Sequence, residues 1–188
     1  MKSVYGLVAV SLVMAACGGG APAEPDTPPQ MPYGNLAQMM RAIPFPASNV
    51  VYDASLEDPG APLEEAGSGG GSRYDNTYPG WEAVVNAGVA MQETANLLRI
   101  PGRVCENGRP VPQDDDTFQQ GIQALADAGA ATIAAGEAAV FDEDALFELT
   151  DVVTNACSSC HEVYRDRTAD NADRCIPEAE LPAAETGE

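Results

Sequence analysis

Basic residues are scarce in this chain of 188 residues. Lysine and arginine together number 9 against 29 aspartates and glutamates, which gives a formal net charge of -20 at pH 7. Such a surface repels nucleic acid and anionic lipid headgroups, so we expect neither as a partner, whereas a basic protein would be attracted to it. A solvated acidic surface that keeps the protein soluble is the simpler interpretation of the same charge.

Beyond the N-terminus the sequence has no apolar run long enough to span a membrane. The first residues, MKSVYGLVAVSLVMAAC, carry one basic residue, an apolar segment and small residues before Cys17, as a secretory signal does. Because Met-Ala-Ala-Cys resembles a bacterial lipobox, we expect residues 1–16 to be removed and Cys17 to be lipidated. An ordinary signal peptide cut at the same place is the alternative. Both interpretations predict export, to the periplasmic side of a bacterial membrane.

The sequence also lacks a credible β-strand, and its apolar residues recur at helical spacing. Residues 17–34 are rich in glycine and proline, which predicts a tether between the lipidated cysteine and the folded part. Residues 35–177 contain four amphipathic segments and predict an all-α domain, an antiparallel four-helix bundle. An acidic tail, residues 178–188, follows.

The boundaries of the four helices are marked by prolines, acidic residues and a long connection. The first helix is expected over 35–43, and Pro44 and Pro46, which follow, must interrupt or kink it. Residues 55–78 are expected to form a flexible surface loop. Thr77 and Pro79 are expected to open the second helix, as N-cap and early proline. The third should follow the acidic run 114–116, and the fourth should begin near Asp142.

Three glycines lie on the inward stripes of the second and third predicted helices: Gly88, Gly129 and Gly136. Each weakens its helix by about 1 kcal/mol relative to alanine, so each needs a reason. One interpretation is that they leave room for a flat cofactor. The other is that they allow two helices to approach closely, and the sequence does not decide between them.

The single histidine of the chain directly follows two cysteines. Cys157-Ser-Ser-Cys160-His161 matches C-x-x-C-H, the signature of covalent haem c attachment. On a helix the two thiols stand one turn apart, where they can form thioethers with the two vinyl groups, and the histidine can bind the iron. A zinc site would need two further ligands, but no second histidine exists and the other cysteines are in separate segments. A redox dithiol would need a βαβ context, which is missing.

Two cysteines remain after these assignments, Cys105 and Cys175. In an oxidising compartment a leftover pair predicts a disulfide, and two free thiols are the alternative. The bond would close a loop of about 70 residues and contribute roughly 4 kcal/mol in the chain-entropy account. It would tie the tail after the fourth helix to the connection between the second and third.

The haem motif continues as Cys-x-x-Cys-His-x-x-Tyr-Arg, with Tyr164 and Arg165 in the last two places. On the last helix of a four-helix bundle, this pattern resembles the class II c-type cytochromes, the cytochrome c′ group. Three further segments are similar to the low-spin, membrane-tethered bacterial members: LAQMMRAIPFPASNVVYDA, GWEAVVNAGVAMQETANLL and RVCENGRPV. The resemblance covers roughly residues 35–175.

The resemblance implies one covalent haem c inside the bundle, with His161 as the fifth iron ligand. Some members leave the sixth position open and bind nitric oxide or carbon monoxide, whereas others fill it with a first-helix methionine and transfer electrons. Met39 and Met40 both lie on the first predicted helix, and adjacent residues point about 100° apart, so only one can face the iron. The Met-Arg pair favours Met40; core packing of both methionines is the alternative.

The resemblance also places Tyr164 and Arg165 beside the cofactor. Arg165 and Arg41 suit bidentate contacts with haem propionates, although in so acidic a protein either can pair with a surface carboxylate instead. No second histidine exists to ligate the iron from the other side. A bis-histidine haem is therefore excluded.

The resulting hypothesis is a monohaem electron carrier that cycles between Fe(III) and Fe(II). We do not expect an enzyme, because no histidine remains for acid–base chemistry. A basic or membrane-bound redox protein is the expected partner, and homodimers are common in the group. The alternatives are a five-coordinate haem protein that binds or sequesters nitric oxide, and a helical lipoprotein without haem that has a structural role.

Overall fold

The computed structural model describes residues 30–61, 78, 80–166, 174–177 and 180. Over these ranges the chain is helical, and its only strand-like pairing is an isolated bridge between Val104 and Pro110. The all-α fold class is therefore confirmed for the described part. The helices are α1 (Leu36–Ala42), α2 (Pro44–Ala54), α3 (Trp81–Leu98), α4 (Asp116–Ala138) and α5 (Glu143–Tyr164).

Several predicted features lie outside the described residues. They are the signal peptide over 1–16, the lipidation site at Cys17, most of the tether and of the 55–78 loop, and all of the acidic tail except residue 180. Within the described part, no helix combines the length and the apolar character needed to cross a membrane.

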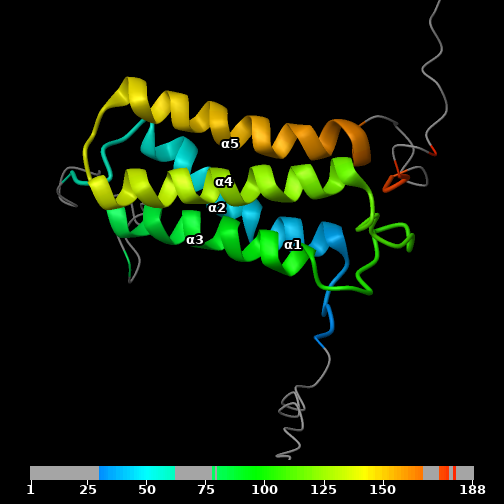
Figure 1. Ribbon diagram of the computed structural model, residues 1–188. Coiled ribbons are helices and arrows are strands. Elements are labelled where there is room, and N and C mark those ends of the chain that lie inside the picture. Colours follow the sequence, from blue (N-terminus) through cyan, green and yellow to red (C-terminus); the bar gives the residue numbers. More distant parts are fainter. Residues whose placement is uncertain (1–29, 62–77, 79, 167–173, 178–179, 181–188) are drawn as a thin grey trace, which may run out of the picture.

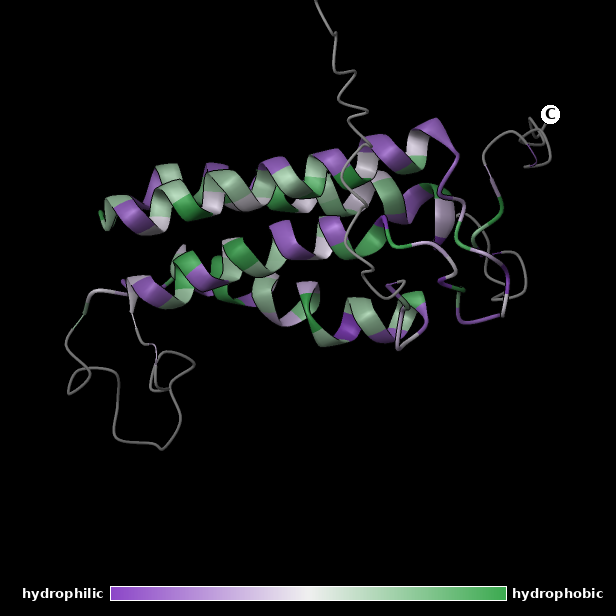
Figure 2. Ribbon diagram, turned by 60° about the horizontal axis from the view of Figure 1, so that its bottom comes forward, coloured by the Kyte–Doolittle hydropathy of each residue, from purple (hydrophilic) through white to green (hydrophobic). Residues whose placement is uncertain are grey.

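The three long helices lie side by side, and the chain reverses direction between α3 and α4 and again between α4 and α5 (Figure 1). The shorter α1 and α2 follow one another along α3 and complete the packing. Each helix carries both apolar and hydrophilic residues around its circumference, as amphipathic helices do (Figure 2). The apolar sides meet in one core.

The first predicted helix is broken where the prolines required it. Asn35 caps α1 through a capping box with Gln38, and the helix stops at Ala42. A second helix, α2, then starts at Pro44 itself, because proline suits the first turn, where its missing N–H costs nothing. Helical hydrogen bonds still cross the break, since the N–H of Ile43 donates to the carbonyl of Met39 and that of Ala47 to Ile43. The break is thus a local kink.

The predicted start of the next helix is wrong. We expected Thr77 and Pro79 to open it, but α3 begins at Trp81, and both expected residues lie outside the described ranges. The N-cap is Gly80, which adopts a φ of +68°. A β-carbon there would also come within 2.9 Å of the carbonyl oxygen of Pro59. Glycine therefore sets this turn, and a positive φ leaves no trace in apolar periodicity.

The last two helices begin at aspartate caps, as the acidic residues predicted. The side chain of Asp115 accepts a hydrogen bond from the N–H of Thr117 at the start of α4. Asp142 does the same for Ala145 at the start of α5. Such caps each stabilise a helix by about 1 kcal/mol.

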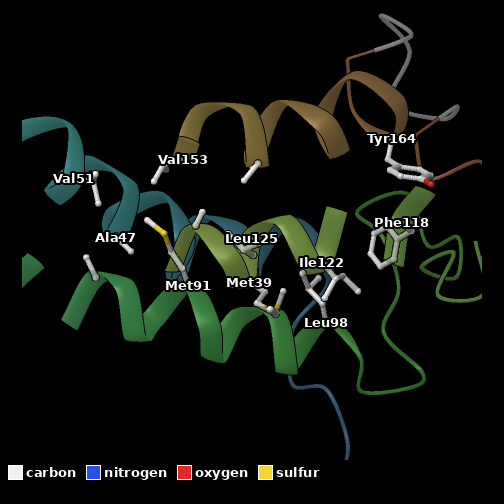
Figure 3. Close-up of a cluster of buried hydrophobic side chains, with 14 of the residues drawn as sticks. Met39, Ala47, Val51, Met91, Leu98, Phe118, Ile122, Leu125, Val153 and Tyr164 are labelled. Atoms are coloured by element: carbon white, nitrogen blue, oxygen red, sulfur yellow. The ribbon is translucent and has the colours of Figure 1, made fainter. Parts of the chain in front are cut away.

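The core fills the space between the helices with apolar side chains that are almost completely buried. Met39, Met91, Ile122 and Leu98 belong to one cluster, to which α5 contributes Val153 (Figure 3). The cluster contains side chains from all five helices, so the described helices share one core.

The glycines on the predicted inward stripes bring α3 and α4 into backbone contact. A β-carbon on Gly88 would lie 2.6 Å from the carbonyl oxygen of Gly129, and one on Gly129 would lie 2.7 Å from that of Gly88. A β-carbon on Gly136 would meet Val85 at 2.7 Å. Of the two interpretations left open, the structure shows close helix approach.

Gly129→Ala should therefore destabilise the protein, although alanine is the better helix former. Propensity alone predicts a gain of about 1 kcal/mol. Because the new methyl group must push α3 and α4 apart, we expect instead a net loss of about 1–3 kcal/mol in the free energy of unfolding, measured with urea. Ala130→Ser, at the exposed neighbouring position, is the control and should change little. A stabilised Gly129→Ala variant would contradict the contact.

Candidate cofactor site

A cavity of about 440 Å³ lies between α1 and α2 on one side and the C-terminal half of α5 on another. Phe118, Gly121 and Leu125 of α4 and Leu98 of α3 complete its wall. Most of the wall is apolar, and the volume lies in the range typical of pockets for organic cofactors. Leu98, Phe118 and Leu125 also belong to the buried core, so the cavity directly adjoins that core.

The haem-type motif occupies the last two turns of α5, and three of its side chains line this cavity. Cys157, Cys160 and His161 are all half-buried, and both cysteines are free thiols. Within the described residues, no group of three or more Cys, His, Asp or Glu side chains is arranged to hold a metal ion. The three side chains share one cavity.

Gly121 belongs to this site, although the sequence did not single it out. A β-carbon on Gly121 would collide with the Sγ atom of Cys160, so the thiol fits only because α4 has no side chain there. The available signal was the presence of a glycine inside a helix, where it is disfavoured. Its partner is 39 positions away in the sequence, so periodicity could not show its purpose.

The structure separates the two adjacent methionines of α1. Met40 lines the cavity, on the wall formed by α1 and α2. Met39 does not line it; only 6% of Met39 is exposed, and it packs near Ile122 and Leu98 in the core (Figure 3). Adjacent helical residues point about 100° apart, which is why they reach different surroundings. Met40 is thus the methionine placed to reach a ligand of the cavity.

Tyr164 lines the cavity and connects the end of α5 to the start of α4. Its hydroxyl donates a hydrogen bond of 2.9 Å to Asp115, the N-cap of α4. Its ring packs edge-on against Phe118, with 5.4 Å between the ring centroids (Figure 3). The described contacts of Tyr164 therefore hold the two helix ends together beside the haem-type motif.

Arg165 also lines the cavity, but its guanidinium is bound to the carboxylate of the next residue. Nε and Nη2 of Arg165 donate to the two carboxylate oxygens of Asp166, at 2.6 and 2.7 Å. Of the two partners expected for Arg165, a haem propionate or a surface carboxylate, the structure shows a surface carboxylate. Nη1 of Arg165 lies 3.4 Å from Nε2 of His161. Burial and this cation lower the pKa of His161, against a smaller opposing effect of Asp166, so the ring is favoured in its neutral, ligating form.

Both thiols of the motif are kept protonated by their surroundings. Burial raises the pKa of Cys157, against a lowering effect of Arg165. Burial, together with the neighbouring Cys157, raises the pKa of Cys160 to about 11. A low-dielectric environment disfavours the charged thiolate in each case. The thiols of the free chain are therefore weak nucleophiles near neutral pH.

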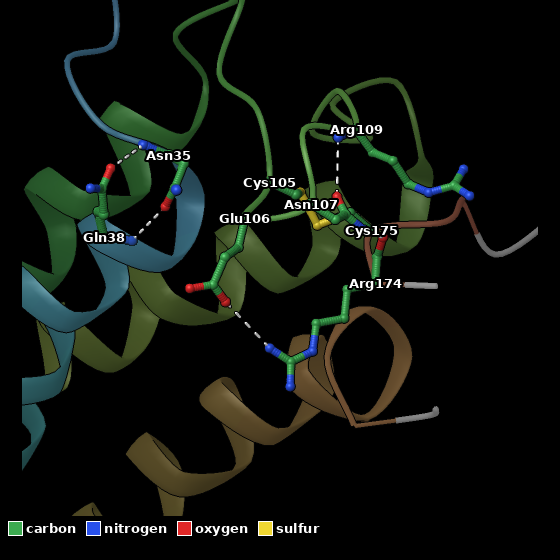
Figure 4. Close-up of a disulfide and its surroundings, with 8 residues drawn as sticks. All are labelled: Asn35, Gln38, Cys105, Glu106, Asn107, Arg109, Arg174 and Cys175. Atoms are coloured by element: carbon green, nitrogen blue, oxygen red, sulfur yellow. Dashed lines mark hydrogen bonds and ion pairs between the residues drawn. A yellow bond between two sulfur atoms is a disulfide. The ribbon is translucent and has the colours of Figure 1, made fainter. Parts of the chain in front are cut away.

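A disulfide between Cys105 and Cys175 borders the cavity at one end (Figure 4). The residues next to each cysteine meet there: Arg174 lies 3.7 Å from a carboxylate oxygen of Glu106. The other carboxylate oxygen of Glu106 accepts a hydrogen bond of 3.1 Å from Arg41 of α1. The bond thus joins the segment after α5 to the α3–α4 connection, and two arginines share one carboxylate beside it.

Comparisons of the chain with protein-family models, with curated proteins and with solved structures find no match.

The raised pKa values predict slow, pH-dependent alkylation of the motif thiols. The test uses Cys17→Ser protein exported without haem-attachment machinery, in a Cys157→Ser background that leaves Cys160 as the free thiol. This variant loses the raising effect of Cys157 but keeps burial, the larger cause, so the pKa of Cys160 should stay above the ordinary value of 9.0 without reaching about 11. The rate of reaction with iodoacetamide should therefore continue to rise above pH 9, because the thiolate is the reacting form. The same protein unfolded in urea is the control, and a plateau near pH 9 in the folded protein would contradict the shift.

Proposed function

We propose that this protein is a monohaem c-type cytochrome that carries single electrons in the bacterial cell envelope. The proposal includes the class II architecture, an antiparallel four-helix bundle in which α1 and α2 together form the first, kinked helix. The observation that carries it is the shared cavity: Cys157, Cys160 and His161 line it from α5, and Met40 lines it from α1. The two expected iron ligands thus belong to the walls of one apolar space.

The two thiols are suited to covalent attachment. Each can add across a vinyl C=C bond, with sulfur on one carbon and the thiol proton on the other, so attachment needs no oxidant. Both cysteines are reduced in the structure, as this addition requires. Gly121 leaves the space that the Cys160 sulfur occupies. The chain therefore brings free thiols and room for them to the same cavity.

Iron ligation would fall to His161 and Met40. The pKa of His161 is lowered by burial and by Arg165, which keeps the imidazole available as a neutral ligand. A haem bound there would supply a one-electron Fe(III)/Fe(II) couple, and methionine ligation favours the reduced state. Because His161 is the only histidine and would be bound to iron, none remains as a general base, so we propose an electron carrier and not an enzyme.

The cavity reaches the protein surface, as electron transfer requires. Phe45 lines it and is 64% exposed, and the exposed side chains of Arg41 and Arg165 also border it. The net charge of -20 favours a basic redox partner, or one held at the same membrane. Export and a lipid anchor at Cys17 belong to the same proposal, as does the option of a homodimer.

The two methionines provide a matched test of the proposal. The protein is matured in a periplasm that attaches haem c, and each methionine is replaced by alanine. Met40→Ala should convert the ferric spectrum from low to high spin and abolish the long-wavelength sulfur-to-iron band, because the sixth ligand is lost. Met39→Ala should keep the spectrum and cost about 2–5 kcal/mol of stability, because it leaves a cavity in the core.

Other outcomes identify the competing functions. A high-spin spectrum in the unaltered protein would indicate an open sixth position and favour binding of nitric oxide. If the band is lost in Met39→Ala but not in Met40→Ala, Met39 is the sixth ligand and Met40 is not. Absence of covalently bound haem, shown by an unchanged protein mass, would refute the cytochrome and favour a structural lipoprotein.

A further inference from the structure

Half of the arginines that the structure describes line the cavity. The structure describes six arginines: Arg41, Arg99, Arg103, Arg109, Arg165 and Arg174. Three of them line the cavity, whereas Glu106 is the only carboxylate among its lining residues. The lining side chains of α2, α3 and α4 carry no charge, so the charged groups that face the cavity come from α1, the end of α5 and the disulfide region. In a chain with a net charge of -20, this excess of cations indicates an anionic ligand.

Two of these arginines converge on one carboxylate. Nη2 of Arg41 lies 3.1 Å from Oε1 of Glu106, and Nη1 of Arg174 lies 3.7 Å from Oε2. Arg41 comes from α1 and Arg174 from the segment after α5, and both line the cavity. Figure 4 shows the side chain of Arg174 reaching the carboxylate of Glu106. Glu106 thus marks a position where a carboxylate is bound between two guanidinium groups.

Arg174 is fixed in place by its neighbours. The next residue, Cys175, is bonded to Cys105, and its N–H donates to the carbonyl of Tyr164 at 3.0 Å. The carbonyl of Arg174 itself accepts a hydrogen bond of 3.0 Å from the side chain of Asn107. Cys175 adopts a φ of +61°, which non-glycine residues rarely do. Three contacts therefore hold the backbone at Arg174 and Cys175.

The guanidinium of Arg174 has donor capacity to spare. Its Nε is buried and has no hydrogen-bond partner among the described residues, and at 3.7 Å the pair with Glu106 is longer than a close charge-assisted hydrogen bond. Guanidinium groups bind carboxylates best in bidentate geometry, which Arg174 does not reach with Glu106. A carboxylate supplied by a ligand could use these donors.

We infer that Arg174, positioned by the Cys105–Cys175 disulfide, binds a carboxylate of the cavity's ligand together with Arg41, beside the carboxylate of Glu106. The inference rests on the proposed function, under which the carboxylate is a haem propionate. It gives the disulfide a purpose in addition to stability, because the bond places a cation at the cavity.

The test measures how the reduction potential of the haem-loaded protein depends on pH. A propionate that ionises near the iron produces a bend in this profile at its pKa, and a nearby guanidinium lowers that pKa. Arg174→Gln should therefore move the bend upward by about one pH unit, the lower end of the effect of an adjacent cation. Arg174→Lys should restore most of the shift, because it restores the charge.

Two further variants make the result specific. Arg109→Gln removes the same charge from the segment that contains Cys105. Because Arg109 does not line the cavity, the bend in the profile of this variant should stay within a few tenths of a pH unit of that of the unaltered protein. Glu106→Gln should move the bend downward, because it removes a competing like charge. The opposite signs for Arg174→Gln and Glu106→Gln would not result from a loss of stability, which thermal unfolding of each variant measures separately.

The failure of this inference differs from the failure of the proposed function. If the unaltered protein gains no haem mass, the proposed function itself is refuted. If haem is attached but Arg174→Gln behaves as Arg109→Gln does, the cytochrome stands and the role of Arg174 is overturned. A Glu106→Gln shift of the same sign as Arg174→Gln would likewise overturn it.

Discussion

The backbone contact between α3 and α4 is the constraint that shapes the rest of the structure. Gly88 and Gly129 leave no space between the two helices for a β-carbon, and Gly136 extends the contact to Val85. The cavity lies on another side of α4, where Gly121 faces Cys160. Glycines on one helix thus serve two purposes: some remove space between backbones, and one provides space for a thiol.

The disulfide complements this contact at the end of the molecule where α5 stops. Cys105 lies in the connection between α3 and α4, which borders the cavity. The Cys105–Cys175 bond joins this connection to the segment after α5. Tyr164 adds a hydrogen bond to the N-cap of α4, so the last turn of α5 is fixed from two directions. A site whose chemistry depends on the last two turns of a helix requires such support, because helix ends otherwise fray.

The sequence was most informative where the signal is local. The periodicity of apolar residues placed the helices, and acidic N-caps placed the starts of α4 and α5. The C-x-x-C-H motif needs only five consecutive residues, so it could be read directly. The missed features depend on partners far away in the chain: Gly121 on Cys160 and Gly80 on Pro59. For Arg41 a surface carboxylate was one of the two expected partners, but the sequence did not identify it as Glu106, 65 positions away. Spacing along one helix cannot report such contacts, and for the same reason it left the purpose of the α3–α4 glycines undecided.

The kink after α1 links the fold to the choice between the two methionines. Pro44 is buried in the cavity wall one turn beyond Met40, so the break in the first helix lies at the site itself. The hydrogen bonds from Ile43 to Met39 and from Ala47 to Ile43 hold α1 and α2 in a fixed relation across that break. Met39 is fixed in turn by the core, and its neighbour must then point about 100° away, toward the cavity. The proline that complicates the sequence pattern is therefore part of the wall that presents Met40, and the core packing of one methionine determines the direction of the other.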